Sequence, residues 1–200
     1  MTRSITVCAY NRPGYLYQVL RSLIVSLRDS PSFDRPATVI GIDPGGDRID
    51  EVKATAIRFA DAVHPWIKTE IIVWPEHMGV SEAPRRLLQY VFMERQSEFN
   101  VHLEDDTVLS PDALALAEWY RSEQRTDPRM WDKIVCLNLF AYSGADADAC
   151  PERVARTHRF GSWGWACTYL SWWLWFSHHW NAKREPQLGF EQIQHTKIRA

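Results

Sequence analysis

Short apolar runs alternate with amphipathic helical patterns over the first 140 residues of this 200-residue chain. The runs are nearly continuous in apolar residues, which is typical of strands buried on both faces, and the segments between them repeat apolar residues at helical spacing. Helices packed on both sides of a mostly parallel sheet cover such strands, so the pattern predicts an α/β fold. The expected strands are 4–10, 37–43, 70–75, 99–104 and 133–140, and the expected helices are 12–27, 48–63, 81–96 and 110–123.

Residues at the starts of two expected helices have the chemistry of helix caps. Asn11 is a candidate N-cap for the first helix, with Pro13 in its first turn. Ser110 is the corresponding candidate for the fourth helix. The alternation stops near residue 141, and a tryptophan-rich segment follows. We therefore expect one domain, in which 1–140 forms the ligand-binding α/β portion and 141–200 is an elaboration of it.

Composition excludes several classes of protein. The net charge is −2 and the basic residues are scattered, which predicts no nucleic-acid partner. The four cysteines have no spacing typical of a zinc or redox motif, and a reducing cytoplasm fits them. Residues 160–180 lack Asp, Glu, Lys and Arg but include glycine, serine, threonine and histidine. We expect no transmembrane segment and a cytoplasmic protein, with peripheral membrane contact as the minor alternative.

Polar and charged groups follow the expected strands where each one ends. Ligands of open α/β sheets bind beyond the carboxyl ends of the strands, so these groups mark the expected site. A helix N-terminus, which favours anions, comes directly after the first of them. The groups are Tyr10-Asn11-Arg12, Asp43, His77-Met78-Gly79 and Glu104-Asp105-Asp106.

The fourth strand ends at three adjacent carboxylates that repel one another: Glu104, Asp105 and Asp106. Carboxylate oxygens suit Mg²⁺ or Mn²⁺, which proteins hold with one or two carboxylates while substrate phosphates complete the shell. An isolated acidic run is more often a solvated turn. The place of this run at the carboxyl edge, in line with Asp43, favours a metal site.

Five segments, in this order, resemble a known family: "TVCAYNRPGYLYQVLRSL", "VIGID", "HMGVSEAPRRLL", "HLEDDTVLSPDAL" and "FGSWGWA". They are similar to nucleotide-sugar glycosyltransferases of the GT-A fold, in particular the N-acetylglucosaminyltransferase-I-like group and family-2 enzymes. The resemblance covers roughly residues 4 to 167. It implies a GT-A, Rossmann-like sheet, with 1–140 as the nucleotide-sugar-binding portion and 141–200 on the acceptor side.

The resemblance also implies roles for individual residues. The donor would be a nucleoside-diphosphate sugar of the UDP or GDP type, carrying a hexose or N-acetylhexosamine, and the ion would be Mn²⁺ or Mg²⁺ at a DxD-like motif. Asp106 would ligate the metal directly. The donor sugar and the acceptor would be bordered by Trp163, Gly164 and Trp165. The residues that would bind the nucleotide sugar are Tyr10, Asn11, Arg12, Asp43, Gly79, Arg85 (or Arg86 beside it), Glu104 and Asp105.

An inverting glycosyltransferase needs a second carboxylate that takes the proton of the acceptor hydroxyl. The family places this base after the Gly-Trp patch, but residues 153–184 contain no Asp or Glu. Glu191, in "LGFEQIQ", is the candidate. Two alternatives stay open: a nucleotide-sugar or glycan-binding module with little or no catalysis, and a nucleotidyltransferase. Of the other tryptophans, Trp172, Trp173 and Trp175 are expected in the core.

Overall fold

The computed structural model describes residues 2–127, 130, 134–139, 154, 160–178 and 180. Six strands in this part of the chain form one sheet in the order β3-β2-β1-β4-β6-β5. The first four strands along the chain are parallel, which confirms the predicted sheet. Their bounds are β1 (Arg3–Ala9), β2 (Ala37–Ile42), β3 (Thr69–Val73) and β4 (Phe99–Glu104), followed by β5 (Leu137–Asn138) and β6 (Trp165–Thr168).

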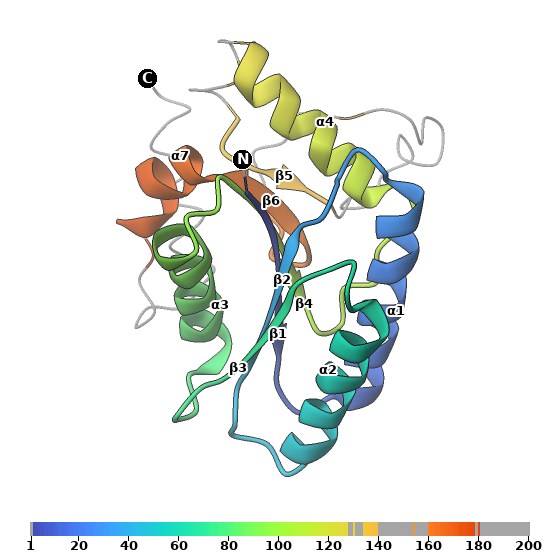
Figure 1. Ribbon diagram of the computed structural model, residues 1–200. Helices are drawn as coiled ribbons and strands as arrows, with labels where there is room; N and C mark the ends of the chain where they lie inside the picture. The colour runs from blue at the N-terminus through green and yellow to red at the C-terminus, as the bar shows by residue number, and fades with distance from the viewer. Residues whose placement is uncertain are drawn as a thin grey trace, which may run out of the picture.

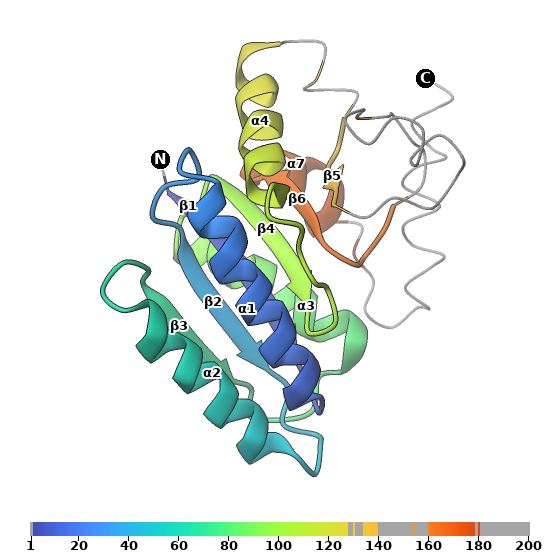
Figure 2. The same cartoon turned by 90° about the vertical axis from the view of Figure 1, so that its right-hand side faces the viewer.

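Helices cover both faces of this sheet (Figures 1 and 2). One face carries α1 (Pro13–Asp29), α2 (Ile49–Val63) and α4 (Ala113–Thr126). The opposite face carries α3 (Gly79–Gln89), which continues as the π-helical segment η1 (Tyr90–Glu94), and α7 (Tyr169–Ser171), which continues as η2 (Trp172–Ser177). The four predicted helices are confirmed, with ends shifted by a few residues.

Alternation along the strands produces a separate core on each face. Ile5, Val7 and Ala9 of β1 pack toward α1, α2 and α4. Cys8 points the other way and joins an aromatic-rich core with α3 and η2. The larger residues of this second core are Leu87, Leu88, Phe92, Trp165, Trp172 and Phe176.

The antiparallel strand β6 is the feature that sequence patterns did not predict. It pairs with β4 and separates β4 from β5. The predicted fifth strand, 133–140, is therefore shorter than expected, at Leu137–Asn138, and lies at the sheet edge. Trp172 is buried as expected, whereas Trp173 is 40% exposed, because it lies on the outer side of η2.

Both predicted helix caps are wrong. Arg12 occupies the N-cap position of α1, and the side chain of Asn11 instead accepts a hydrogen bond from the backbone N–H of Arg48 at 2.7 Å. Ser110 lies before the start of α4 and donates to the carboxylate of Asp112 at 2.6 Å. Asn11 thus binds the segment before α2, and Ser110 binds the side chain of Asp112, so neither side chain accepts a hydrogen bond from a backbone N–H of the helix that follows it.

Helix length also bears on membrane insertion. Among the residues that the structure describes, no helix combines the length and the apolar character that crossing a membrane requires.

Candidate functional site

Two of the three adjacent carboxylates meet Arg12 at the carboxyl end of the sheet. The Arg12 guanidinium donates to Asp105 through Nη2 and to Asp106 Oδ2 through Nη1, the latter at 2.9 Å. The backbone N–H of Tyr10 also donates to Asp105, at 3.1 Å. The strand ends of β1 and β4 are neighbours in the sheet, so the structure brings together the residues that the sequence placed there.

Asp105 and Asp106 differ in how far they reach solvent. The side chain of Asp105 is 3% exposed and that of Asp106 is 32% exposed. Burial raises the pKa of Asp105, although the Tyr10 N–H and the Arg12 charge oppose that rise. Arg12 itself responds to both carboxylates: burial alone would lower its pKa, but Asp105 and Asp106 raise it. Asp105 is thus an interior anchor for Arg12, and Asp106 is the carboxylate that faces outward.

This donor set fits a hard divalent cation. Asp106 Oδ2 is used by Arg12, and Oδ1 accepts no hydrogen bond from the residues that the structure describes. The carboxylates of Glu104, Asp105 and Asp106 carry more negative charge than Arg12 balances. A carboxylate oxygen that has no hydrogen-bond donor, in a region of excess negative charge, is the kind of ligand that Mg²⁺ and Mn²⁺ prefer. Asp106 would therefore hold such an ion.

Asp43, at the end of β2, binds the backbone at the start of α3 through hydrogen bonds. It is 5% exposed, and its carboxylate accepts hydrogen bonds from the backbone N–H groups of Met78 at 3.2 Å and Gly79 at 2.8 Å. His77 Nδ1 lies 2.8 Å from the same carboxylate. Gly79 has φ +77°, a conformation that glycine adopts without strain. Asp43 thus sits where the sequence predicted, but its oxygens are engaged by the loop that precedes α3.

The loop after β2 lies close to the side chains of His77 and Asn11, and this approach requires glycine at positions 45 and 46. A Cβ on Gly45 would lie 2.5 Å from the His77 ring, and one on Gly46 would lie 2.4 Å from the Asn11 side chain. Asn11 also donates to Asp47 at 2.6 Å. The sequence indicated only a turn at "PGGD", because the neighbours of its glycines come from distant segments.

Arg85 lies on α3 and pairs with Glu82, a residue for which the sequence predicted no role. Its guanidinium donates to Glu82 at 2.8 Å through Nε, and Arg86 donates to the same carboxylate at 2.7 Å. The hydrogen bond from Arg85, opposed by burial and assisted by Arg86, lowers the pKa of Glu82 to about 2. The predicted nucleotide contact of Arg85 would require this ion pair to be shared or broken.

The Glu82 ion pair predicts a pH-dependent contribution to stability. The carboxylate is easier to ionise in the folded chain, so its contribution is present above its ordinary pKa of 4.5 and is lost as pH falls toward 2. We expect Glu82→Gln to lower the free energy of unfolding at neutral pH by about 1–2 kcal/mol, less than the full shift implies, because solvent screens surface pairs. Urea denaturation between neutral pH and acid should show the difference shrinking below the ordinary pKa. Glu94→Gln, on an exposed residue of η1, controls for loss of one charge. The prediction would be contradicted if the difference in unfolding free energy between the wild type and Glu82→Gln persisted unchanged in acid.

The tryptophan-glycine-tryptophan segment has one exposed and one buried ring. Trp163 is 48% exposed, whereas Trp165 is 1% exposed and packs against Phe160 and Phe176. Gly164, with φ +90°, approaches Thr107 so closely that a Cβ would lie 2.8 Å from its methyl group. The segment therefore borders the turn after Asp106. The burial of Trp165 does not fit the predicted sugar contact, because neither face of its ring is open.

Glu104 turns toward the interior of the sheet. Its carboxylate lies 3.3 Å from Nε2 of the buried His102, and Cys8 of β1 is its partner in the β1–β4 register. Burial, reinforced by the charges of Glu104, Asp105 and Asp43, raises the pKa of the Cys8 thiol well above its ordinary value. Glu104 is thus less available at the edge than Asp106. Glu191, the predicted base, lies outside the described residues.

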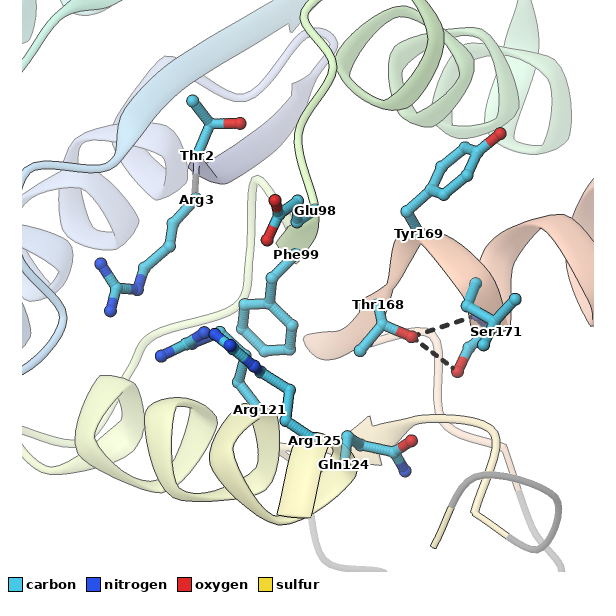
Figure 3. A pocket seen from close by; sticks show the side chains of 11 residues that line it. Thr2, Arg3, Glu98, Phe99, Arg121, Gln124, Arg125, Thr168, Tyr169 and Ser171 are labelled. Carbon is cyan, nitrogen blue, oxygen red and sulfur yellow. Dashed lines mark hydrogen bonds between the residues drawn. The ribbon is translucent and has the colours of Figure 1, made fainter. Parts of the chain in front are cut away.

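A pocket of about 400 Å³ opens at the opposite end of the sheet (Figure 3). It lies between the starts of β1 and β4 and the helices α4 and α7, and Phe99, Arg121 and Tyr169 are among its lining residues. Among the residues that the structure describes, none of those predicted for the site lines it. The three adjacent carboxylates therefore lie at the carboxyl edge, at the other end of the sheet from this cavity.

Comparison with known proteins supports the fold. No protein-family profile and no curated protein sequence matches the chain. Among solved structures, residues 1–349 of TarS from S. aureus superpose with a TM-score of 0.60 at 12% identity, over 98% of this chain and 56% of that one. The same protein in complex with UDP gives a TM-score of 0.58 at 11% identity, over 97% and 54%.

A mannosyltransferase from Pyrobaculum calidifontis, PcManGT, is also similar. Its structure in complex with GDP-Man and Mn²⁺ matches with a TM-score of 0.58 at 17% identity, over 83% of this chain and 44% of that one. The chain thus spans about half the length of the solved structures that it matches. At these identities the likeness shows the fold, which is the GT-A arrangement expected from the sequence.

Proposed function

We propose that this chain transfers a sugar from a nucleoside-diphosphate sugar to an acceptor hydroxyl, with inversion at the sugar carbon. The observation that carries the proposal is the arrangement of Arg12, Asp105 and Asp106 at the carboxyl edge of the sheet. Structures of the same fold contain UDP in one case and GDP-Man with Mn²⁺ in another, which supports a nucleotide-sugar ligand. In this proposal 1–140 binds the donor and 141–200 borders the acceptor.

Breaking the bond between a sugar and a diphosphate leaves negative charge on the departing diphosphate. Arg12 would stabilise that charge, because its guanidinium is half-exposed and already fixed by Asp105. A divalent ion held at Asp106 would supply further charge stabilisation when bound. The Tyr10 N–H keeps Asp105 in place and so keeps Arg12 aimed at the edge. Glu191 stays our candidate for the base that takes the acceptor proton, and Trp163 for the ring that borders the sugar.

Nucleotide binding should separate the roles of Arg12 and Asp106. We expect Arg12→Met to weaken binding of UDP or GDP in the presence of Mn²⁺ by roughly 10–100-fold, the size expected for a lost charged hydrogen bond. Binding of Mn²⁺ alone should not weaken, because the variant removes a positive charge beside Asp106. Isothermal titration of the wild type and the variant with nucleotide, and then with metal alone, measures both quantities.

Arg12→Lys is the matched control, because lysine keeps the charge but loses the two-pronged geometry. We expect it to fall between the wild type and Arg12→Met. Equal affinity of all three proteins for the nucleotide would contradict the role given to Arg12. Failure of the wild type to bind either nucleotide with Mn²⁺ would contradict the proposed ligand.

A further inference from the structure

Three side chains with metal-binding atoms meet between β1 and β4, beneath the edge described above. They are Cys8, His102 and Glu104, and their sulfur, imidazole nitrogen and carboxylate oxygen all lie within 4.8 Å of one another. The strand register creates this grouping, because Cys8 lies opposite Glu104 and Thr6 lies opposite His102. Alternation along each strand turns all three toward the α3 face.

The chemistry of this set differs from that of Asp106. A thiolate, an imidazole and a carboxylate form a ligand set typical of zinc, with a fourth position for water. Sulfur ligands favour thiophilic ions over Mg²⁺ and Mn²⁺, which prefer oxygen. The charges also balance, since a thiolate and a carboxylate neutralise a doubly charged ion. Neutrality matters here because Cys8 and His102 are only 7% and 1% exposed, and burying net charge is costly.

A hydrogen-bonded row of polar side chains holds His102 in the required orientation. Its Nδ1 lies 2.9 Å from Thr6 Oγ1, which accepts from Asn100 Nδ2 at 2.8 Å and lies 3.4 Å from the carbonyl of Val101. Ser4 extends the row by donating to Asn100 at 2.7 Å. When the Thr6 hydroxyl donates to the Val101 carbonyl, it can accept from Nδ1–H of His102. Nε2 then keeps its lone pair for a metal, and such outer partners fix the ligand tautomer.

We propose that Cys8, His102 and Glu104 form a second cation site, which takes a thiophilic divalent ion such as Zn²⁺ or Cd²⁺. Binding replaces the thiol proton of Cys8, which leaves to solvent, with a sulfur–metal bond. The ion would also fix the Glu104 carboxylate in its inward position, one residue before Asp105. As a consequence that rests on the proposed function, Zn²⁺ should inhibit Mn²⁺-dependent sugar transfer.

Cobalt is a suitable probe, because Co²⁺ bound by a thiolate in tetrahedral geometry absorbs visible light and shows a sulfur-to-metal charge-transfer band. The protein for this titration is the full reduced, metal-free chain carrying Cys150→Ser. The substitution prevents the thiol of Cys150, which lies outside the described residues, from binding Co²⁺. We expect Co²⁺ to produce the charge-transfer band and Zn²⁺ to abolish it by displacement. Cys8→Ser should remove the band, whereas Cys136→Ser and Asp106→Asn should keep it.

A second pair of variants tests the site without touching a ligand. Thr6→Val removes the hydroxyl that orients His102, and Thr6→Ser keeps it. Loss of an outer partner typically weakens metal affinity about 10–100-fold, so we expect that loss in Thr6→Val only. Thermal unfolding of each metal-free variant checks that it is folded.

The proposal is overturned if the wild type gives no charge-transfer band, if the band survives Cys8→Ser, or if Asp106→Asn removes it. Equal Co²⁺ affinity in Thr6→Val and Thr6→Ser would overturn the role of the polar row. These readouts do not depend on sugar transfer, so they stand even where transfer is not observed.

Discussion

Asp106→Asn is expected to lower metal-dependent turnover of a nucleoside-diphosphate sugar by about 100-fold or more, because metal coordination contributes several kcal/mol and 1.36 kcal/mol is tenfold. Asparagine keeps the size of the side chain and an oxygen, but it lacks the charge that attracts a divalent ion. The Asp106 side chain is 32% exposed, its Oδ2 accepts a hydrogen bond from Arg12, and its Oδ1 has no hydrogen-bond donor among the described residues. Release of nucleoside diphosphate in the presence of Mn²⁺ measures the effect.

Two variants make this result specific. Asp50→Asn removes a carboxylate that is 92% exposed on α2, and it should leave turnover unchanged. Asp105→Asn should lower turnover as well, but through Arg12, whose anchor it weakens. If Asp106→Asn retains Mn²⁺-dependent turnover near the wild-type level, the metal ligand has been assigned to the wrong residue.

Trp165→Ala is expected to cost about 3–5 kcal/mol of unfolding free energy, the range for removing a large buried aromatic side chain. Its ring is 1% exposed and contacts Phe160, Phe176 and His102. The substitution would remove the packing that stabilises β6, the strand that brings the Gly-Trp segment next to β4. Urea denaturation measures the change.

Trp163→Ala is the matched control, two residues away and 48% exposed. We expect it to change stability by less than about 1 kcal/mol, as surface substitutions usually do. Its effect should instead appear in the KM for donor or acceptor, because Trp163 is our candidate for the ring that borders the sugar. A larger loss of stability in Trp163→Ala than in Trp165→Ala would reverse the roles given to the two rings.

The strand ends could be predicted from the sequence because their positions depend on local patterns. Apolar runs located β1 to β4, and the rule that ligands bind at carboxyl ends then pointed to Arg12, Asp43 and Asp106. The structure gathers those residues at one edge. What the pattern could not show is that Asp43 is engaged by the backbone at the start of α3.

Features that depend on contacts between distant segments were missed. Strand β6 has only four residues, and its run of tryptophan, alanine, cysteine and threonine shows no alternation of apolar and polar side chains. The pairing of β6 with β4 places the Trp165 ring against His102, Phe160 and Phe176, which bury it. In the sequence, Trp163 and Trp165 look equivalent. The grouping of Cys8 with His102 was also invisible, since a parallel sheet joins residues that lie far apart along the chain.

Sugar transfer by the wild-type chain is measured by the release of nucleoside diphosphate. The chain is incubated with a panel of UDP- and GDP-sugars and candidate acceptors, with Mn²⁺ and with a chelator. We expect at least one donor to release nucleoside diphosphate with Mn²⁺, and we expect the chelator to stop the release. Release of pyrophosphate would identify a nucleotidyltransferase. Tight nucleotide binding with no release for any donor would identify a binding module. Either result would contradict the proposed sugar transfer.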